Sequence, residues 1–422
     1  MQKRVYTESH LEERRLITSF ALCFIAKIDK FEIAAWTDDT DHALLILLSY
    51  LHHDGKELSS KDLAERLRVW IEQGLRCLDR MPLGIGRTLG SVVLSKEYLV
   101  NPAETAYRSW VKSNRTIAPN GSLMRTHPLG IICMASTLEE TFKIAAEFSI
   151  ITHADLRCVV ACCIATGLIR GILRGEVLCE NDIDSMIENA YSWTETWMQN
   201  GREGAISHVD GDDPTQDSAS LNRDEFDRHL RVTNFGDLQL DDAQTMGYVY
   251  KALGSAILAL RMGMRDTSHK TKLGGRGRSP NSAIFEKIIR DLILEGGDAD
   301  TNACIAGGIL GCWLGYESLP PHWRDGMAHN AWLVEKCEAL SQVVGVGDGM
   351  PGYTGSKDPD TRIDGGKGLL NDEELKAREK EFTYQYLKRC AEADKDEQAK
   401  KREAEQLKGK KKGWAGILPF KG

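Results

Sequence analysis

Apolar residues recur at the three- and four-residue spacing of a helix along most of the chain, and no alternating strand pattern of any length is found. In residues 285–294 these apolar side chains fall on one helical face. Gly296 and Gly297 follow at once and predict the end of that helix. A second helix is predicted from residue 299, and its glycines recur every four residues, at Gly307, Gly311 and Gly315. The pattern predicts an all-α fold with a close helix–helix approach along these glycines.

Oxygen-bearing side chains gather at two of the predicted helix starts. In residues 36–51, one hydroxyl and two carboxylates precede an amphipathic helix, on Thr37, Asp38 and Asp39. The predicted apolar face of that helix consists of Ala43, Leu44, Leu47, Leu48 and Leu51. The same chemistry recurs after Gly297, on Asp298, Asp300 and Thr301.

Such a set of oxygens is costly in a packed helix pair unless a cation binds it. Hard oxygen ligands suit Mg²⁺, Mn²⁺ or Ca²⁺ better than a soft metal. The two threonines and four aspartates are sufficient for a binuclear magnesium site, with waters in the remaining positions and Mn²⁺ as the alternative metal. The simpler interpretation is that each stretch is a capped loop with acidic residues in the first helical turn. That interpretation explains either stretch taken alone.

Taken together, the motifs resemble the ADP-ribosylglycohydrolase family. The T-D-D of residues 37–39 and the G-D-A-D-T-N-A of residues 297–303 match the family's two metal motifs, and the segments between them agree. These segments are APNGSLMRTHPLGI (118–131), ITHAD (151–155) and GYVYKALGSAILAL (247–260). The resemblance spans about residues 6–323, with gaps. It implies a compact orthogonal multi-helix fold with a binuclear metal site at helix N-termini, and two Mg²⁺ ions as cofactor.

The beginning of the chain departs from the family. Members normally open with a G-D-A-x-G motif followed by a glutamate, and no such motif exists here. The first family motif is thus truncated, and Glu8 stands where that glutamate would stand. The resemblance makes Glu8, Asp38 and Asp300 the candidate catalytic carboxylates. The alternative for Glu8 is a solvated acid near a frayed terminus.

Several turns are candidates for substrate binding. Glycines before a helix let backbone amides approach a phosphate, which applies to Gly84 and Gly86, although a tight turn explains them equally well. In the family, the turn formed by Asn120, Gly121 and Ser122 lines the ADP-ribose cleft, whereas Asn and Ser are also ordinary N-caps.

Two further polar residues lie in the matching segments. His153 is a candidate ligand for a ribose or phosphate oxygen, with a satisfied structural histidine as the alternative. For Arg125 we expect a structural ion pair in preference to a phosphate clamp.

The implied reaction is Mg²⁺-dependent hydrolysis of the 1″ linkage of ADP-ribose, carried by a protein or by a small molecule. Cleavage at an anomeric carbon passes through an oxocarbenium-like state and needs a carboxylate as acid or base. The leaving group stays open among arginine, serine, acetyl and phosphate. The alternatives are an ADP-ribose-1″-phosphate phosphatase on the same metals and a non-catalytic ADP-ribose-binding or structural family member.

The domain organisation follows from changes in composition. Residues 1–344 are expected to form the helical domain, with a polar, acidic excursion at 200–240 and a basic, Gly-rich loop at 266–281. Residues 345–370 are linker-like, and residues 371–422 form a charged tail that is helical or disordered.

The net charge of −8 argues against nucleic acid or an anionic membrane as the main partner. No apolar run is expected to span a membrane, and the N-terminal residues do not resemble a signal peptide. The eleven cysteines are scattered and lack zinc-ligand spacing, which indicates reduced core residues. We therefore expect an intracellular monomer, cytoplasmic or nuclear, that binds an ADP-ribose-containing small molecule or protein.

Overall fold

The computed structural model describes residues 36–204, 206, 214–273, 280–346, 352–385, 387–388, 391 and 395. The chain divides into two compact units, and the boundary between their described parts falls after residue 369. In the second unit, residues 372–385 form a helix whose side chains are mostly exposed. The first unit carries all the other elements described here.

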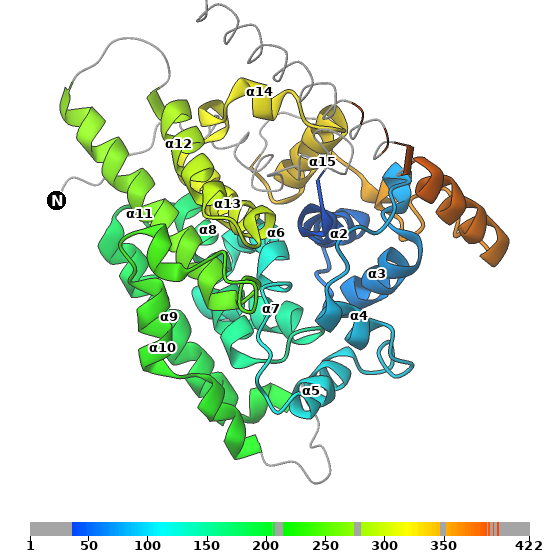
Figure 1. Cartoon of the computed structure of the whole chain (residues 1–422), viewed down its shortest axis with the longest axis horizontal. Coiled ribbons are helices and arrows are strands. Elements are labelled where there is room, and N and C mark those ends of the chain that lie inside the picture. The colour runs from blue at the N-terminus through cyan, green and yellow to red at the C-terminus, as the bar shows by residue number, and fades with distance from the viewer. Residues whose placement is uncertain are drawn as a thin grey trace, which may run out of the picture. The chain divides into compact units, whose positions relative to one another are not determined.

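The first unit is built from helices, and the described residues contain no strand, only two isolated bridges (Figure 1). The all-α prediction is therefore confirmed. The α-helices are α2 (Asp38–His52), α3 (Ser60–Gln73), α4 (Arg87–Val93), α5 (Pro102–Lys112), α6 (His127–Ile132), α7 (Leu138–Ile150), α8 (Leu156–Arg174), α9 (Glu180–Gln199), α10 (Arg223–Leu230), α11 (Val249–Leu273), α12 (Pro280–Leu294), α13 (Ala299–Leu314), α14 (Pro321–Arg324) and α15 (Asn330–Val343). The 3₁₀-helices are η2 (Arg76–Leu78), η3 (Leu123–Arg125), η4 (Cys133–Ala135), η5 (Gly201–Gly204), η6 (Pro214–Ser220), η7 (Phe235–Leu238), η8 (Tyr316–Ser318), η9 (Gly355–Lys357) and η10 (Pro359–Thr361).

Helix α8 lies at the centre and packs against α6, α7, α9, α11 and α13. Contrary to the expectation from the sequence, it is long and apolar enough to cross a membrane by length and composition. However, 94% of its most apolar window is buried inside the protein. Such burial is typical of a core helix, because the neighbouring helices cover the surface that lipid would otherwise contact.

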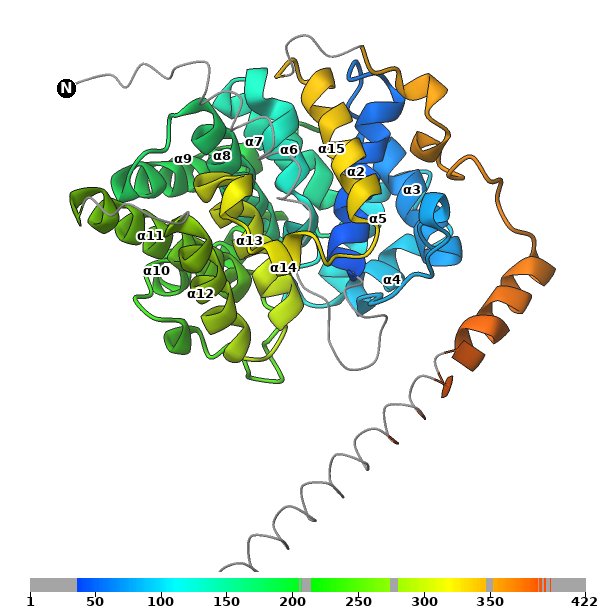
Figure 2. The same cartoon turned by 90° about the horizontal axis from the view of Figure 1, so that it is seen from above.

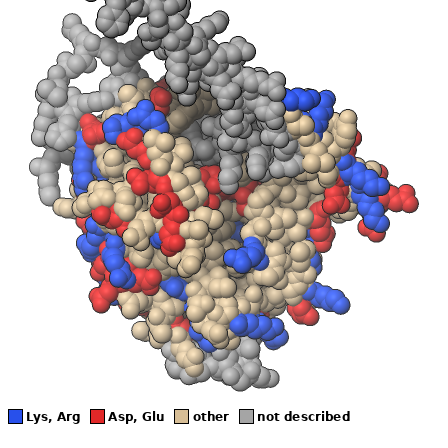
Figure 3. Space-filling view, in the orientation of Figure 1, with Lys and Arg blue, Asp and Glu red and all other residues tan. Residues whose placement is uncertain are grey.

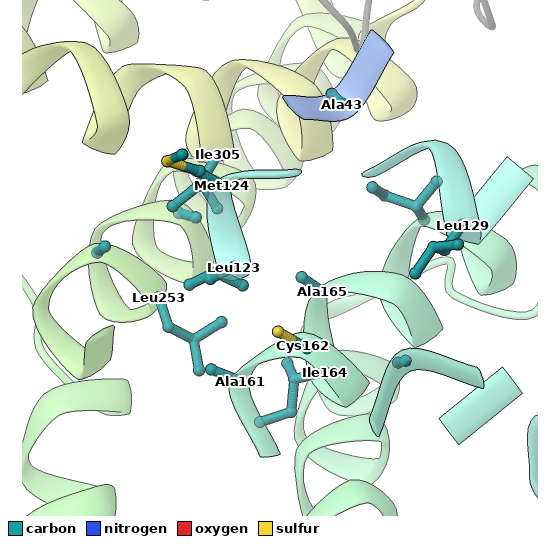
Figure 4. Close-up of a cluster of buried hydrophobic side chains, with 14 of the residues drawn as sticks. Ala43, Leu123, Met124, Leu129, Ala161, Cys162, Ile164, Ala165, Leu253 and Ile305 are labelled. Carbon is teal, nitrogen blue, oxygen red and sulfur yellow. The ribbon is translucent and has the colours of Figure 1, made fainter. Parts of the chain in front are cut away.

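The core joins segments that lie far apart in the sequence. Figure 4 shows Leu123 of η3, Leu253 of α11 and Ile305 of α13 around the α8 residues Ala161 and Ala165. Burying apolar side chains contributes roughly 25 cal/mol for each Å² removed from water, so this cluster holds the elements around the site in place. The described cysteines are free thiols, and all of them except Cys179 are buried, as expected.

Helix α2 differs from its prediction. We expected one apolar face, but nearly every residue from Asp39 to Leu51 is buried. The reason is that α2 packs on several sides, with α15 and α3 as two of its neighbours (Figures 1 and 2). The first turn of this helix therefore carries its carboxylates into the protein interior.

Close approaches between helices depend on glycines, though partly on others than those predicted. A Cβ on Gly263 of α11 would lie 2.5 Å from Leu310 Cδ1 of α13, so a larger residue there would require the end of the Leu310 side chain to move. On the predicted stripe, a Cβ on Gly311 would make an ordinary 3.7 Å contact with Phe285. The α11–α13 contact thus owes its closeness to a glycine on the partner helix.

The predicted linker 345–370 is corrected by the structure, because its described part is held on the helical unit by specific bonds. Lys336 Nζ on α15 donates a hydrogen bond of 2.6 Å to Asp358 Oδ2. Arg76 Nη2 on η2 donates one of 3.1 Å to the carbonyl of Gly368. The glycines and aspartates that gave the stretch its linker-like composition serve tight turns and side-chain contacts instead.

The predicted basic loop at 266–281 is also shorter than expected. Helix α11 continues to Leu273 and α12 begins at Pro280, so at most residues 274–279 remain for a connection, and they lie outside the described part. The acidic excursion at 200–240 contains η6, α10 and η7 among its described residues.

Candidate functional site

The first half of the site is the start of α2. Thr37 is the N-cap residue and has extended backbone angles, but its side chain does not cap the helix. Its Oγ1 instead donates a hydrogen bond of 2.7 Å to Oδ2 of Asp39. A hydroxyl that donates its proton keeps its lone pairs, so Thr37 remains able to offer oxygen to a cation.

The second half is the start of α13, which a tight turn positions. Gly296 and Gly297 both have positive φ angles, of 77° and 67°. A Cβ on Gly297 would lie 1.8 Å from the carbonyl oxygen of Leu240, so any other residue would push the turn away. Asp298 is the N-cap of α13, and Asp300 lies in its first turn.

The two helix starts face each other closely enough for their carboxyls to interact. Burial and the nearby carboxyls of Asp39 and Asp300 raise the pKa of Asp38 to about 9. Burial and the repulsion from Asp300 raise the pKa of Asp39 to about 7, although the hydroxyls of Thr37 and Thr301 oppose this shift. Five of the six residues predicted as metal ligands therefore belong to one cluster: Thr37, Asp38, Asp39, Asp300 and Thr301.

Asp298 interacts with Asp300 and Thr301 and contributes to the shift on Asp39. Burial raises its pKa, and a hydrogen bond of 2.8 Å from Asn120 Nδ2 to Asp298 Oδ2 opposes the shift. Four carboxyls with shared repulsion are the electrostatic situation that a divalent cation relieves.

One oxygen of this cluster has a special position. Asp39 Oδ1 is buried and receives no hydrogen bond from the described residues.

Within the described part, no group of three or more His, Cys, Asp and Glu side chains is arranged to hold a metal ion by itself. The carboxylates alone thus do not form a closed cage, and the threonine hydroxyls are needed to complete a set of oxygen donors. The chemistry of the whole set fits a hard cation such as Mg²⁺.

A short antiparallel bridge fixes one wall of the site. Asn120 N donates to the carbonyl of Gly247 at 3.0 Å, and Val249 N donates to the carbonyl of Ala118 at 3.0 Å. A Cβ on Gly247 would lie 3.7 Å from Asp298 Oδ2. The bridge therefore explains why the segments around residues 120 and 247 belong together, and it places the Asn120 amide against Asp298.

The predicted substrate-binding residues separate into two groups. Asn120, Gly121 and His153 lie together, because a Cβ on Gly121 would meet His153 Nε2 at 3.0 Å. The Ser122 side chain lies apart from these residues. Ser122 is fully buried, and its hydroxyl accepts a hydrogen bond of 3.0 Å from Ser149 Oγ. Its position in the turn directs the side chain into the core.

The glycine loop before α4 lies against Asp38, one of the candidate metal ligands. Gly84 has φ +83°, and a Cβ there would lie 2.2 Å from Asp38 Oδ1. A Cβ on Gly86 would meet nothing within 4 Å, so Gly86 borders open space. Gly84 is thus required by a close approach, whereas Gly86 is not.

Gly84→Ala is expected to lower Mg²⁺-dependent turnover by roughly 10- to 100-fold, because the added methyl must displace the Asp38 carboxyl. Steady-state rates of product release would measure the effect. Gly345→Ala is the matched control, because Gly345 also has a positive φ, of 79°, but has open space around its Cβ position. Equal losses in the two variants would show that backbone strain, and not the contact with Asp38, is responsible.

Arg125 corrects another expectation. It is fully buried, and no carboxylate of the described residues forms an ion pair with it. Its Nη2 instead donates to the carbonyl of Phe148 at 2.8 Å and to Thr152 Oγ1 at 2.7 Å. Phe148 is in the last turn of α7, where carbonyls lack helical partners and the negative end of the helix dipole favours a cation.

The sequence interpretation missed Gly247, Gly297 and Thr152 as residues that shape the site. Gly247 and Gly297 each stand next to a matched sequence motif, so the sequence did contain a signal for them. Only the tertiary contacts show which neighbouring atoms need the space that each glycine leaves. Glu8, the third candidate carboxylate, lies outside the described residues.

On the face shown in Figure 3, acidic side chains form a band over the region of α11 to α13. The exposed acids of this region include Asp241, which borders Gly296 and lies beside the turn that carries Asp298.

Comparison with known proteins identifies the family of this chain. The model of the ADP-ribosylglycohydrolase family matches residues 5–349. The chain is similar to a solved structure described as "ADP-ribosylglycohydrolase-related protein complex", with 20% sequence identity and a TM-score of 0.46, over 79% of this chain and 99% of that chain. No curated protein matches. Because the family model covers most of the sequence, the chain belongs to the ADP-ribosylglycohydrolase family.

Proposed function

We propose that the chain hydrolyses the 1″ linkage of ADP-ribose derivatives and that this activity depends on Mg²⁺. The observation that carries the proposal is the meeting of two helix starts, each with two aspartates and a threonine, around the buried and unbonded Asp39 Oδ1. An oxygen in that position costs free energy unless a cation or another donor satisfies it.

The residues that would hold the metal are Thr37, Asp38, Asp39, Asp298, Asp300 and Thr301. When bound, divalent ions would orient the ribose hydroxyls, lower the pKa of a water molecule and offset the repulsion among the carboxylates. Asn120 already donates to Asp298 Oδ2, and it would hold that carboxylate in one orientation.

The chemistry requires one carboxylate to accept a proton. As a water oxygen bonds to C1″, the bond from C1″ to the leaving atom breaks, and the leaving atom takes up a proton. Asp38 and Asp300 are the candidates for the acid and base, since they lie on opposite helix starts and interact with each other. Gly84 packs against Asp38 Oδ1, because a Cβ there would lie 2.2 Å from that oxygen, and it limits where this carboxyl can lie.

The rest of the ligand would lie along the turn at Asn120 and Gly121. His153 lies beside this turn, and burial followed by the charge of Arg125 lowers its pKa to about 3. A neutral ring offers one donor and one acceptor, and a diphosphate or a ribose hydroxyl needs a donor at this point.

The direct test is product release from 1″-linked ADP-ribose substrates with Mg²⁺ and with excess chelator. The panel contains the arginine, serine, acetyl and phosphate linkages, with Asp300→Ala as the inactive variant. Asp291→Ala is the matched control, because Asp291 is an aspartate of the neighbouring α12 whose ion pairs, with Lys287 and Arg290, lie at the surface. Turnover of a linkage that chelator and Asp300→Ala both abolish would support the proposal and identify the leaving group.

Two other outcomes would replace the proposal. Release of inorganic phosphate alone would make the chain an ADP-ribose-1″-phosphate phosphatase on the same residues. ADP-ribose binding that Mg²⁺ tightens, with no turnover of any linkage, would make it a binder. Turnover unchanged in excess chelator would reject the metal mechanism.

A further inference from the structure

A chain of hydrogen bonds links the buried Arg125 to the candidate ligand cleft. Arg125 Nη2 donates to Thr152 Oγ1 at 2.7 Å, and Thr152 Oγ1 lies 2.7 Å from Nδ1 of His153. All three residues are at least nine-tenths buried. His153 Nε2 lies at the other side of the ring, beside the Gly121 turn.

The direction of these bonds can be assigned from donors and acceptors. A guanidinium only donates, so Thr152 Oγ1 must accept from Arg125. The hydroxyl proton of Thr152 then has two possible acceptors, His153 Nδ1 at 2.7 Å and the Ser149 carbonyl at 3.5 Å. That carbonyl already accepts the backbone amides of Thr152 and His153 at 3.1 and 2.9 Å. His153 Nδ1 is therefore the better acceptor for the Thr152 hydroxyl, because it is closer and the Ser149 carbonyl is already occupied.

The state of the ring follows. Nδ1 accepts from Thr152, so it carries no proton, and the single proton of a neutral imidazole must then be on Nε2. The ring is neutral because it is buried and faces the charge of Arg125. His42 of α2 also faces this region, and burial and Arg125 lower its pKa well below the usual range, so it adds no charge.

We propose that Arg125 is a positioning residue that acts through Thr152 to hold His153 in the Nε2–H tautomer, so that Nε2 is a fixed donor to a ligand oxygen beside Asn120 and Gly121. The donation from Nε2 to a ligand oxygen rests on the proposed ADP-ribose chemistry. The tautomer of His153 is a property of the protein alone and does not depend on that proposal.

This role explains why Arg125 is buried without a carboxylate. A carboxylate partner would offset the charge that keeps His153 neutral, and accordingly Nε and Nη1 of Arg125 have no hydrogen-bond partner among the described residues. The α7 carbonyl of Phe148 holds the guanidinium without cancelling its charge. The second hydrogen bond from Arg125 Nη2 is donated to Thr152 Oγ1 and orients the Thr152 hydroxyl.

The first test is the tautomer itself, read in the full chain without ligand by ¹⁵N NMR of the histidine rings. The wild type is expected to show His153 with Nε2 protonated and Nδ1 unprotonated, with His153→Gln used to assign the signal. Thr152→Ser, which keeps the hydroxyl, should retain this pattern. Thr152→Val, which keeps the shape and loses the hydroxyl, should give a mixture. A wild-type ring with the proton on Nδ1 would overturn the proposal.

The second test is binding of ADP-ribose, measured by calorimetry. Thr152→Val is expected to weaken binding by about 10-fold, the effect of losing one well-oriented hydrogen bond to a polar ligand, and Thr152→Ser should restore it. In a His153→Gln background, where an amide donor takes the place of Nε2–H, Thr152→Val should have no further effect. An equal loss in both backgrounds would mean that Thr152 acts only on the packing, and would refute the positioning role.

The two tests separate this inference from the proposed function. The Nε2–H pattern in a chain that turns over no 1″-linked substrate would leave the tautomer assignment standing and reject the hydrolase. Turnover with the proton on Nδ1 would do the reverse.

Discussion

Replacing Asp39 by asparagine is expected to lower Mg²⁺-dependent hydrolysis by at least about 100-fold, because it removes the charge of a buried carboxylate whose Oδ1 has no hydrogen-bond partner among the described residues. Asparagine has nearly the same shape, so the first turn of α2 should be kept. Steady-state rates at saturating Mg²⁺ would measure the loss. Asp291→Asn, at the surface of α12, should keep full activity.

The same substitution should leave the fold intact. Asp39 is 3% exposed and repelled by Asp300, so a neutral side chain there removes an unfavourable interaction when no cation is bound. Thermal unfolding in excess chelator should therefore occur at the same or a higher temperature than in the wild type. A variant that is inactive only because it unfolds would contradict the metal-ligand role, and so would one that keeps wild-type activity.

Asp41→Ala is expected to have the largest effect on stability, a decrease of about 3–5 kcal/mol in the free energy of unfolding. The Asp41 carboxylate is fully buried one turn into α2. Its Oδ1 accepts from Trp36 Nε1 at 2.7 Å, and its Oδ2 accepts from Trp70 Nε1 at 3.0 Å. Arg80 lies 3.7 Å from it. Removing the carboxylate leaves two indole donors without their acceptor and removes the negative charge beside the Arg80 guanidinium, whose Nη2 keeps its hydrogen bond of 2.6 Å to the Trp36 carbonyl.

Urea unfolding followed by circular dichroism would measure this change. The matched control is Asp291→Ala, where an exposed ion pair with Lys287 is lost and the effect should stay below about 1 kcal/mol. If Asp41→Ala were no more destabilising than the control, the buried network would not hold the start of α2.

The sequence was sufficient to predict which oxygens come together, because Thr37, Asp38 and Asp39 and their counterparts near residue 300 stand at helix starts, where periodicity and glycines are easily recognised. It was not sufficient to show that Asp39 Oδ1 is unbonded or that Thr37 donates to Asp39. Those facts depend on rotamers that the packing of α2 against its neighbours decides.

The differences between the expected and the observed contacts have the same origin. Ser122 has the chemistry of a phosphate ligand, but the path of the backbone through the turn directs it to Ser149. Residues 352–369 have the composition of a linker, but contacts such as Lys336–Asp358 hold them on the helical unit. Local propensity describes the turn correctly in each case, whereas tertiary contacts decide where the side chains go.

Arg125 shows the limit of arguing from residue type. A buried arginine usually has a carboxylate partner, which made an ion pair the natural expectation. The structure gives it the end of α7 and a threonine instead, and this difference suggests a role for His153 that no motif indicates.

The measurement that tests the central claim most directly is Mn²⁺ binding, followed by electron paramagnetic resonance, to the wild type and to the Asp39→Asn and Asp300→Asn double variant. The account predicts about two bound ions per wild-type chain, displaceable by Mg²⁺, and none at this site in the variant. A wild-type chain that binds no Mn²⁺, or a variant that binds it equally well, would contradict the assignment of the two helix starts as a metal centre.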